Sequence, residues 1–130
     1  MKKIKLTLSI FFGLFLSGPA FAIDKNSSGE QIYKEVCSVC HTAGVANAPK
    51  LGDQNSWKKL IGEGQVIITA HGYVGVRAMP PKGGRQDLSV EQFAEALNFM
   101  VNKSGGNWST PDKPMLDKIN IEISNRKKTQ

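Results

Sequence analysis

Two cysteines and a histidine stand close together in this 130-residue chain, as Cys37 and Cys40 followed directly by His41. Two side chains three positions apart lie about one turn apart on the same side of a helix. Both thiols can therefore form thioether bonds to one porphyrin, while His41 offers an imidazole nitrogen to its iron. Cys-x-x-Cys-His is the attachment pattern of a c-type haem. We predict that Cys37 and Cys40 bind one haem covalently and that His41 is an axial iron ligand.

Two other uses of the cysteines are less consistent with the sequence. A disulfide or a redox-active pair remains open, but a redox Cys-x-x-Cys usually accompanies a strand–helix–strand pattern, which is missing here. A structural zinc site needs four ligands, commonly from two separated clusters. The chain has no third cysteine, and its second histidine, His71, stands alone.

A second axial ligand is predicted at Met79, which precedes Pro80 and Pro81. A thioether favours ferrous iron and raises the reduction potential. The two prolines restrict the backbone and prevent a helix, which holds the loop stiffly around a weak iron–sulfur bond. His71 is the alternative ligand, although we expect it to be an exposed or edge residue in a turn over residues 71–75.

Helical patterns surround these residues. Capping-box pairs predict that a first helix begins near Ser27 or Ser28 and ends at His41, and that a last helix runs from Ser89 to about Asn102. Before the first helix we expect a short, loose lead over residues 23–27. Between the two, we predict short helices over residues 55–61, capped by Asn55, and 66–70.

Two further residues are candidates for haem contacts. Residues 42–53 form a loop rich in turn formers, and Pro49 within it has a carbonyl that can accept the second ring N–H of His41. Loop rigidity alone is the other explanation for this proline. Trp57 can donate its indole N–H to a haem propionate, or it can serve only as part of the core.

Residues 1–22 are predicted to be a signal peptide rather than part of the fold. A basic start, an apolar run too short to cross a membrane comfortably, and a small-x-small ending at Ala22 support this prediction. We expect cleavage after Ala22, export to the periplasm and a mature chain that begins at Ile23. An uncleaved membrane anchor is the alternative.

The mature chain of 108 residues carries 14 basic and 11 acidic residues, a net charge of +3, because the predicted signal removes three lysines. No basic stripe with interleaved aromatic residues indicates nucleic-acid binding. We expect one haem domain over residues 23–106. Residues 107–130 differ in composition and are predicted to be a short helix or disordered, so that their deletion leaves the fold and the haem spectrum intact.

Taken together, these motifs resemble those of class I c-type cytochromes, and within them the bacterial cytochrome c5 family. The resemblance covers residues 27–103 and rests on four segments in order: residues 37–44, 48–53, 78–84 and 97–100. It implies a small all-α fold of three to five helices around one covalently bound haem, with His41 and Met79 as axial ligands and Pro49 orienting His41. It also implies that the first and last helices cross closely, through Gly29 and Tyr33 on one and Ala96 and Phe99 on the other. Several c5 members have a further cysteine where Arg85 stands here, so their disulfide is absent.

The resemblance implies a periplasmic electron carrier rather than an enzyme, exchanging single electrons with redox proteins through transient contacts near Ala43, Val45, Ala46 and Pro80. No nucleic-acid partner and no stable membrane insertion are expected after cleavage. One alternative is a haem-bearing subunit of a larger periplasmic oxidoreductase. Another is catalysis at the haem itself, which requires an open iron position and therefore a Met79 that is not a ligand.

Overall fold

The computed structural model describes residues 23–24 and 26–130, so the predicted signal peptide lies outside the described residues. Over this range the regular elements are helices, and extended pairing is limited to an isolated bridge between Val76 and Met79. This confirms the predicted all-α class. The α-helices are α1 (Gly29–Ile32), α2 (Ser38–His41), α3 (Gln54–Glu63), α4 (Gln65–Val74), α5 (Val90–Lys103) and α6 (Lys113–Lys128). Short 3-10 helices span Val45–Asn47 and Pro81–Gly84.

The first predicted helix is present, but it is not regular. Ser28 caps it through the predicted capping box with Gln31. Between α1 and α2 the residues Tyr33–Cys37 form a π-helix, in which the Ser38 N–H bonds to the Tyr33 carbonyl. Such wide turns are rare and often lie at functional sites. Here the wide turn includes Cys37, the first predicted attachment point.

The first and last helices of the predicted haem domain cross closely, as the resemblance implies. A Cβ on Gly29 would lie 2.2 Å from the Glu95 carbonyl oxygen, so only glycine permits the approach of α1 to α5. Beside this contact the rings of Tyr33 and Phe99 are 5.4 Å apart. Ala96 is 1% exposed and lies in the same interface.

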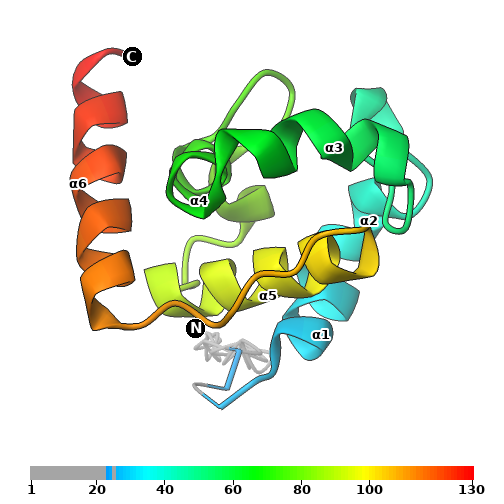
Figure 1. The fold of residues 1–130 in the computed structure, drawn as a ribbon, viewed down its shortest axis with the longest axis horizontal. Coiled ribbons are helices and arrows are strands. Elements are labelled where there is room, and N and C mark those ends of the chain that lie inside the picture. The colour runs from blue at the N-terminus through cyan, green and yellow to red at the C-terminus, as the bar shows by residue number, and fades with distance from the viewer. Residues whose placement is uncertain (1–22, 25) are drawn as a thin grey trace, which may run out of the picture.

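Three apolar clusters surround α5 and α4. The first cluster joins the first helical segment, α3, α4 and α5 through Tyr33, Trp57, Ile68, Leu97, Met100 and Val101. The second cluster contains Ile32, Val36, Leu88, Phe93 and Ala96. The third cluster joins α4 to α6 through Ala70, Val74, Ile119 and Ile123. Figure 1 shows the result, with α5 running between α1 on one side and α3 and α4 on the other.

The middle of the chain is more helical than predicted. Asp53, not Asn55, caps α3, since its carboxylate accepts the N–H groups of Asn55 and Ser56. The turn predicted over residues 71–75 is wrong, because α4 continues to Val74 and only Gly75 ends it. Gly72 is part of the helix for a packing reason: a Cβ there would lie 2.7 Å from Cζ of Phe93.

The segment after α5 forms a helix that packs on the body of the molecule. Asp112 caps α6, whose 16 residues stand against α4 at the edge of the molecule (Figure 1). Ile119 is fully buried and Ile123 is 5% exposed. The disordered alternative for residues 107–130 is therefore contradicted. Deletion of the segment would uncover Ala70 and Val74, so we no longer expect it to leave the fold intact.

Candidate haem site

Cys37 and Cys40 are both free thiols and partly buried, so the structure does not contain the disulfide that the sequence left open. Cys37 packs against both the first and the second apolar cluster. Burial raises the pKa of the Cys37 thiol to about 11. An uncharged sulfur is therefore favoured at this position. A thioether meets that requirement, because it carries no ionisable proton.

His41 is held in one orientation. Its side chain is only 7% exposed, and Nδ1 lies 2.8 Å from the Pro49 carbonyl oxygen. A carbonyl can only accept, so Nδ1 carries the proton and Nε2 is left with its lone pair. The Leu51 N–H also donates to the His41 carbonyl, at 2.8 Å, which closes the loop on the helix end. The result is an imidazole prepared to donate Nε2 to a metal.

Met79 is positioned by the backbone on either side of it. Its N–H donates to the Val76 carbonyl at 2.9 Å, and the Val76 N–H donates to the Met79 carbonyl at 3.1 Å. The side chain is partly buried against the second apolar cluster, the same cluster that Cys37 contacts. Thioether and thiol thus belong to one packed region, although they are far apart in the sequence.

The loop that carries Met79 adopts unusual backbone angles. Gly75 has a φ of 100°, and a Cβ there would lie 3.1 Å from the Pro81 ring. Arg77 and Lys82 have φ values of 53° and 55°, which non-glycine residues rarely adopt. Lys82 is also held by its Nζ, which bonds to the Gln86 carbonyl at 2.8 Å and lies 4.7 Å from the centre of the Tyr73 ring.

Trp57 is a core residue, 2% exposed, and its indole N–H donates to the Lys50 carbonyl at 2.8 Å. Its ring is 6.2 Å from that of His41. The N–H predicted for a propionate therefore already has a partner in the chain, which favours the core explanation.

His71 lies half-buried on α4. Burial lowers its pKa, and the positive charge of Arg126 on α6 lowers it further. Its charged surroundings thus include the C-terminal helix.

Sequence reasoning missed the residues of α4 that support Met79. Gly72 lets α4 lie close to the Phe93 ring, where a Cβ would be 2.7 Å from Cζ, and Cε of Met79 is at ordinary contact distance from the same point, 3.5 Å. Tyr73 contacts the second apolar cluster with its ring edge-on to Phe93, and its hydroxyl donates to the Leu88 carbonyl at 3.3 Å. No local pattern indicates these roles, because they depend on how α4 lies against α5.

The donor set fits an iron porphyrin. Two thiols one turn apart, an oriented imidazole and a thioether in a partly apolar region are the groups that bind and ligate a haem of the c type. Zinc lacks comparable support, since no three His, Cys, Asp or Glu side chains gather within the part of the chain that the structure describes.

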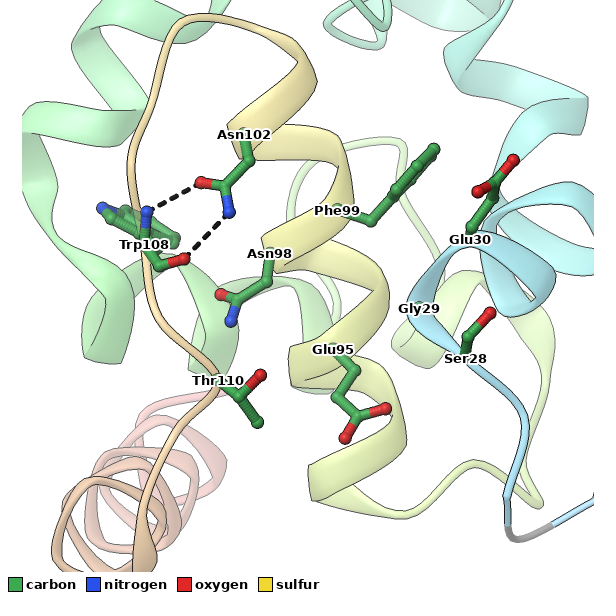
Figure 2. A pocket seen from close by; sticks show the side chains of 9 residues that line it. All are labelled: Ser28, Gly29, Glu30, Glu95, Asn98, Phe99, Asn102, Trp108 and Thr110. Atoms are coloured by element: carbon green, nitrogen blue, oxygen red, sulfur yellow. Dashed lines mark hydrogen bonds between the residues drawn. The ribbon is translucent and has the colours of Figure 1, made fainter.

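A cavity of about 410 Å³ lies elsewhere, between α1, α5 and the segment that leads to α6. Figure 2 shows its polar lining, including Glu95, Asn98 and Asn102, with the two hydrogen bonds between Asn102 and the Trp108 backbone. None of the predicted haem residues lines it. It is therefore a surface hollow beside the helix crossing and not part of the candidate site.

Comparisons with known proteins agree with this site. Residues 24–100 match the family model described as cytochrome c oxidase, cbb3-type, subunit III. Cytochrome c-555 of Chlorobaculum tepidum is 37% identical over 70% of this chain and 87% of its own length. Cytochrome c5 of Ectopseudomonas mendocina is 40% identical over 56% of this chain and 86% of its own.

Among solved structures, the cytochrome fold recurs in a crystal structure of an electron transfer complex of nitrite reductase with cytochrome c. That chain is 38% identical, with a TM-score of 0.56, and the match covers 58% of this chain and 93% of the other. In the described residues, no helix is both long and apolar enough to span a membrane. The family match ends before α6. The relatives are small electron-carrying cytochromes rather than enzymes, and this chain belongs with them to the class I c-type cytochromes of the c5 family.

Proposed function

We propose that this protein is a periplasmic electron carrier with one haem c, attached through Cys37 and Cys40 and ligated by His41 and Met79. The observation that carries the proposal is the bond from His41 Nδ1 to the Pro49 carbonyl, which presents Nε2 as a ligand beside the two thiols. Bound haem would supply one-electron redox chemistry. The predicted signal peptide, cleaved after Ala22, would deliver the chain to the periplasm.

The side chains around the site fit electron transfer better than catalysis. With His41 and Met79 both bound, a haem iron would have no position left for a substrate, and Met79 is held in place by backbone bonds and by packing. A stiff ligand set requires little rearrangement when the charge of the centre changes. Catalysis at the haem would need a free position on the Met79 side.

Exposed apolar side chains lie close to the cysteines in the sequence and in the Met79 loop. Val39, between them, is 72% exposed, and Val45, in the loop after His41, is 51% exposed. Ala43, Ala46 and Pro80 are exposed as well. A small surface of this kind suits the weak, quickly released contacts of redox partners. In the solved neighbour, nitrite reductase is the partner of the cytochrome; for this chain we propose only a redox protein.

Covalent attachment and export can be tested together. The exported protein, produced with haem-attachment machinery, is extracted with acidified acetone and weighed intact. We expect the haem to stay on the polypeptide and the mass to equal a chain beginning at Ile23 plus one haem. Free extraction of the haem would contradict the attachment, and a retained N-terminus in the membrane fraction would make the protein an anchored cytochrome.

A second candidate is a haem-bearing subunit of a larger oxidoreductase. It is favoured by the oxidase subunit named in the matching family description and by α6, which lies beyond the matched residues. Purification from the native periplasm under mild conditions distinguishes the two. A carrier elutes alone at the mass of one chain, whereas a subunit elutes with a stoichiometric partner.

A further inference from the structure

The backbone nitrogen of Ile23 lies against an acidic side chain 64 positions later. It is 3.5 Å from Oδ2 of Asp87. In the precursor this nitrogen is an amide, which can donate one hydrogen bond. After cleavage following Ala22 it would be the terminal ammonium, which is a full positive charge with three donors.

The lead before α1 is fixed next to this contact, in contrast to the loose lead predicted from the sequence. The side chain of Ile23 packs against the second apolar cluster. One residue further, the Asp24 carbonyl accepts from Nε2 of Gln92 at 3.0 Å and from the Ser27 N–H at 3.0 Å. The Ile23 nitrogen is therefore directed toward Asp87 by contacts on both its side chain and the following residue.

The Asp87 carboxylate is ionised and held in one orientation, so it can pair with a second cation. Nε and Nη2 of Arg85 bond to its two carboxylate oxygens, each at 2.9 Å, and this pairing holds the pKa of Asp87 well below its usual range. The hydrogen bond to Asp87 raises the pKa of the Arg85 guanidinium, and the carboxylate of Glu35 also interacts electrostatically with Arg85 and raises it further. Among the described residues, the charged group that accepts from the Ile23 nitrogen is Asp87.

The contact between Ile23 and Asp87 lies next to the loop that carries Met79, on the methionine side of the candidate haem site. Arg85 follows the Met79 loop, and the Leu88 N–H bonds to the Arg85 carbonyl at 3.3 Å. Leu88 is 2% exposed and belongs to the second apolar cluster, against which Ile23 and Met79 both pack. Asp87 lies within the turn from Arg85 to Leu88 that follows the Met79 loop, so a contact that restrains Asp87 also restrains this turn.

We propose that removal of the signal peptide creates an ion pair between the Ile23 ammonium and the Asp87 carboxylate, which ties the new N-terminus to the turn after the Met79 loop. The inference rests on cleavage after Ala22, which is part of the proposed function. Asp87 is a positioning residue in this arrangement, and the pair forms only in the processed protein.

The ion pair can be measured on the mature holoprotein. The terminal amine is converted to its ¹³C-dimethyl form, which keeps its charge, and is titrated by NMR in the reduced, diamagnetic state. An isolated α-amino group has a pKa of about 7.7–8.0. We expect the acid dissociation constant of the terminal amine to be about threefold smaller in the wild type than in Asp87→Asn, as for a partly exposed ion pair. Asp87→Asn is expected to restore the ordinary value.

Asp117→Asn is the matched control, because Asp117 is an exposed aspartate paired with Lys113 on α6, away from Ile23. It should leave the terminal amine as in the wild type. Equal titration of wild type and Asp87→Asn, with the mass showing Ile23 as the first residue, would overturn the ion pair alone. A mass showing another first residue would overturn it at the cleavage step and would revise the proposed processing as well.

Discussion

His41 and Met79, the two proposed axial ligands, are held by different kinds of interaction. The imidazole of His41 is buried, and its own ring nitrogen donates a directional bond to the Pro49 carbonyl. The Met79 side chain packs against the second apolar cluster, and its position follows from backbone bonds to Val76 and from the packing of α4 and α5. The first ligand is fixed by its side chain, the second by its surroundings.

The methionine side of the site depends more on the rest of the molecule than the histidine side. A hydrogen bond within an eight-residue loop survives small movements of distant helices. Apolar packing has no such local restraint, so a displaced helix changes the position of Met79 before that of His41. We therefore expect perturbations of α4, α5 and α6 to act first on the methionine side.

The largest effect is expected for His41→Ala. This change removes the proposed ligand itself and leaves the Pro49 carbonyl without its donor. We expect a large loss of holoprotein and complete loss of the six-coordinate, low-spin spectrum. Absorption spectra of the exported protein, normalised to haem content, provide the measurement. A normal low-spin spectrum would mean that His41 is not the ligand.

Met79→Ala should leave the haem attached, because both cysteines and His41 remain. It should abolish the weak red charge-transfer band of the ferric protein, open a position to added ligands and lower the potential. We expect a shift on the order of 0.1 V, since axial ligands span about 0.8 V. Voltammetry and ligand titration measure both effects.

His71→Ala is the control for this prediction, because His71 is the alternative ligand. It should change neither the band nor the potential. If His71→Ala removes six-coordination while Met79→Ala leaves spectrum and potential intact, the assignment of the methionine side is wrong.

Ile119→Ala tests whether α6 supports the methionine side through α4. Ile119 is fully buried beside Ala70 and Val74, so its truncation should lower the free energy of unfolding by about 2–5 kcal/mol. Ile121, two residues along, is 63% exposed, and Ile121→Ala should change the free energy by less than about 0.5 kcal/mol. Denaturation is monitored through both the red band and the haem absorption. In Ile119→Ala the red band should disappear at a lower denaturant concentration than the change in haem absorption. Equal effects of the two substitutions would show that α6 is not part of the core.

Gly72→Ala is expected to have the smallest effect of the four test substitutions, and it acts on the packing of α4 against Phe93. The added methyl group would lie too close to the Phe93 ring, which packs in the same apolar cluster as Met79, at a cost of about 1–3 kcal/mol for an overpacked site. Gly62 lies in α3, where an added Cβ would have nothing within 4 Å, so Gly62→Ala should stabilise by about 0.5–1 kcal/mol. The free energy of unfolding and the intensity of the red band are measured for Gly72→Ala and Gly62→Ala. Stabilisation by Gly72→Ala would show that α4 does not approach Phe93 this closely.

Much of the candidate site could be predicted because its information is local. Cys37, Cys40 and His41 are specified by spacing within one helical turn, and the capping boxes at Ser28 and Ser89 are complete within four residues. The periodicity of the first and last helices is likewise local, and the all-α class follows from the resemblance that the four short segments carry. For such features a short stretch of sequence contains the whole physical cause.

The tertiary structure decided what depends on contacts between distant segments. Glycine usually disfavours helices, so the sequence predicts a turn at Gly72, yet here this residue permits α4 to approach Phe93. An isolated polar helix has little stability, so the sequence predicts a removable tail, yet Ile119 and Ile123 find an apolar face on α4. Trp57 offers a free donor in the sequence, and the fold supplies the Lys50 carbonyl as its partner. In each case the decisive partner lies on another element, which periodicity and propensity along a single segment do not identify.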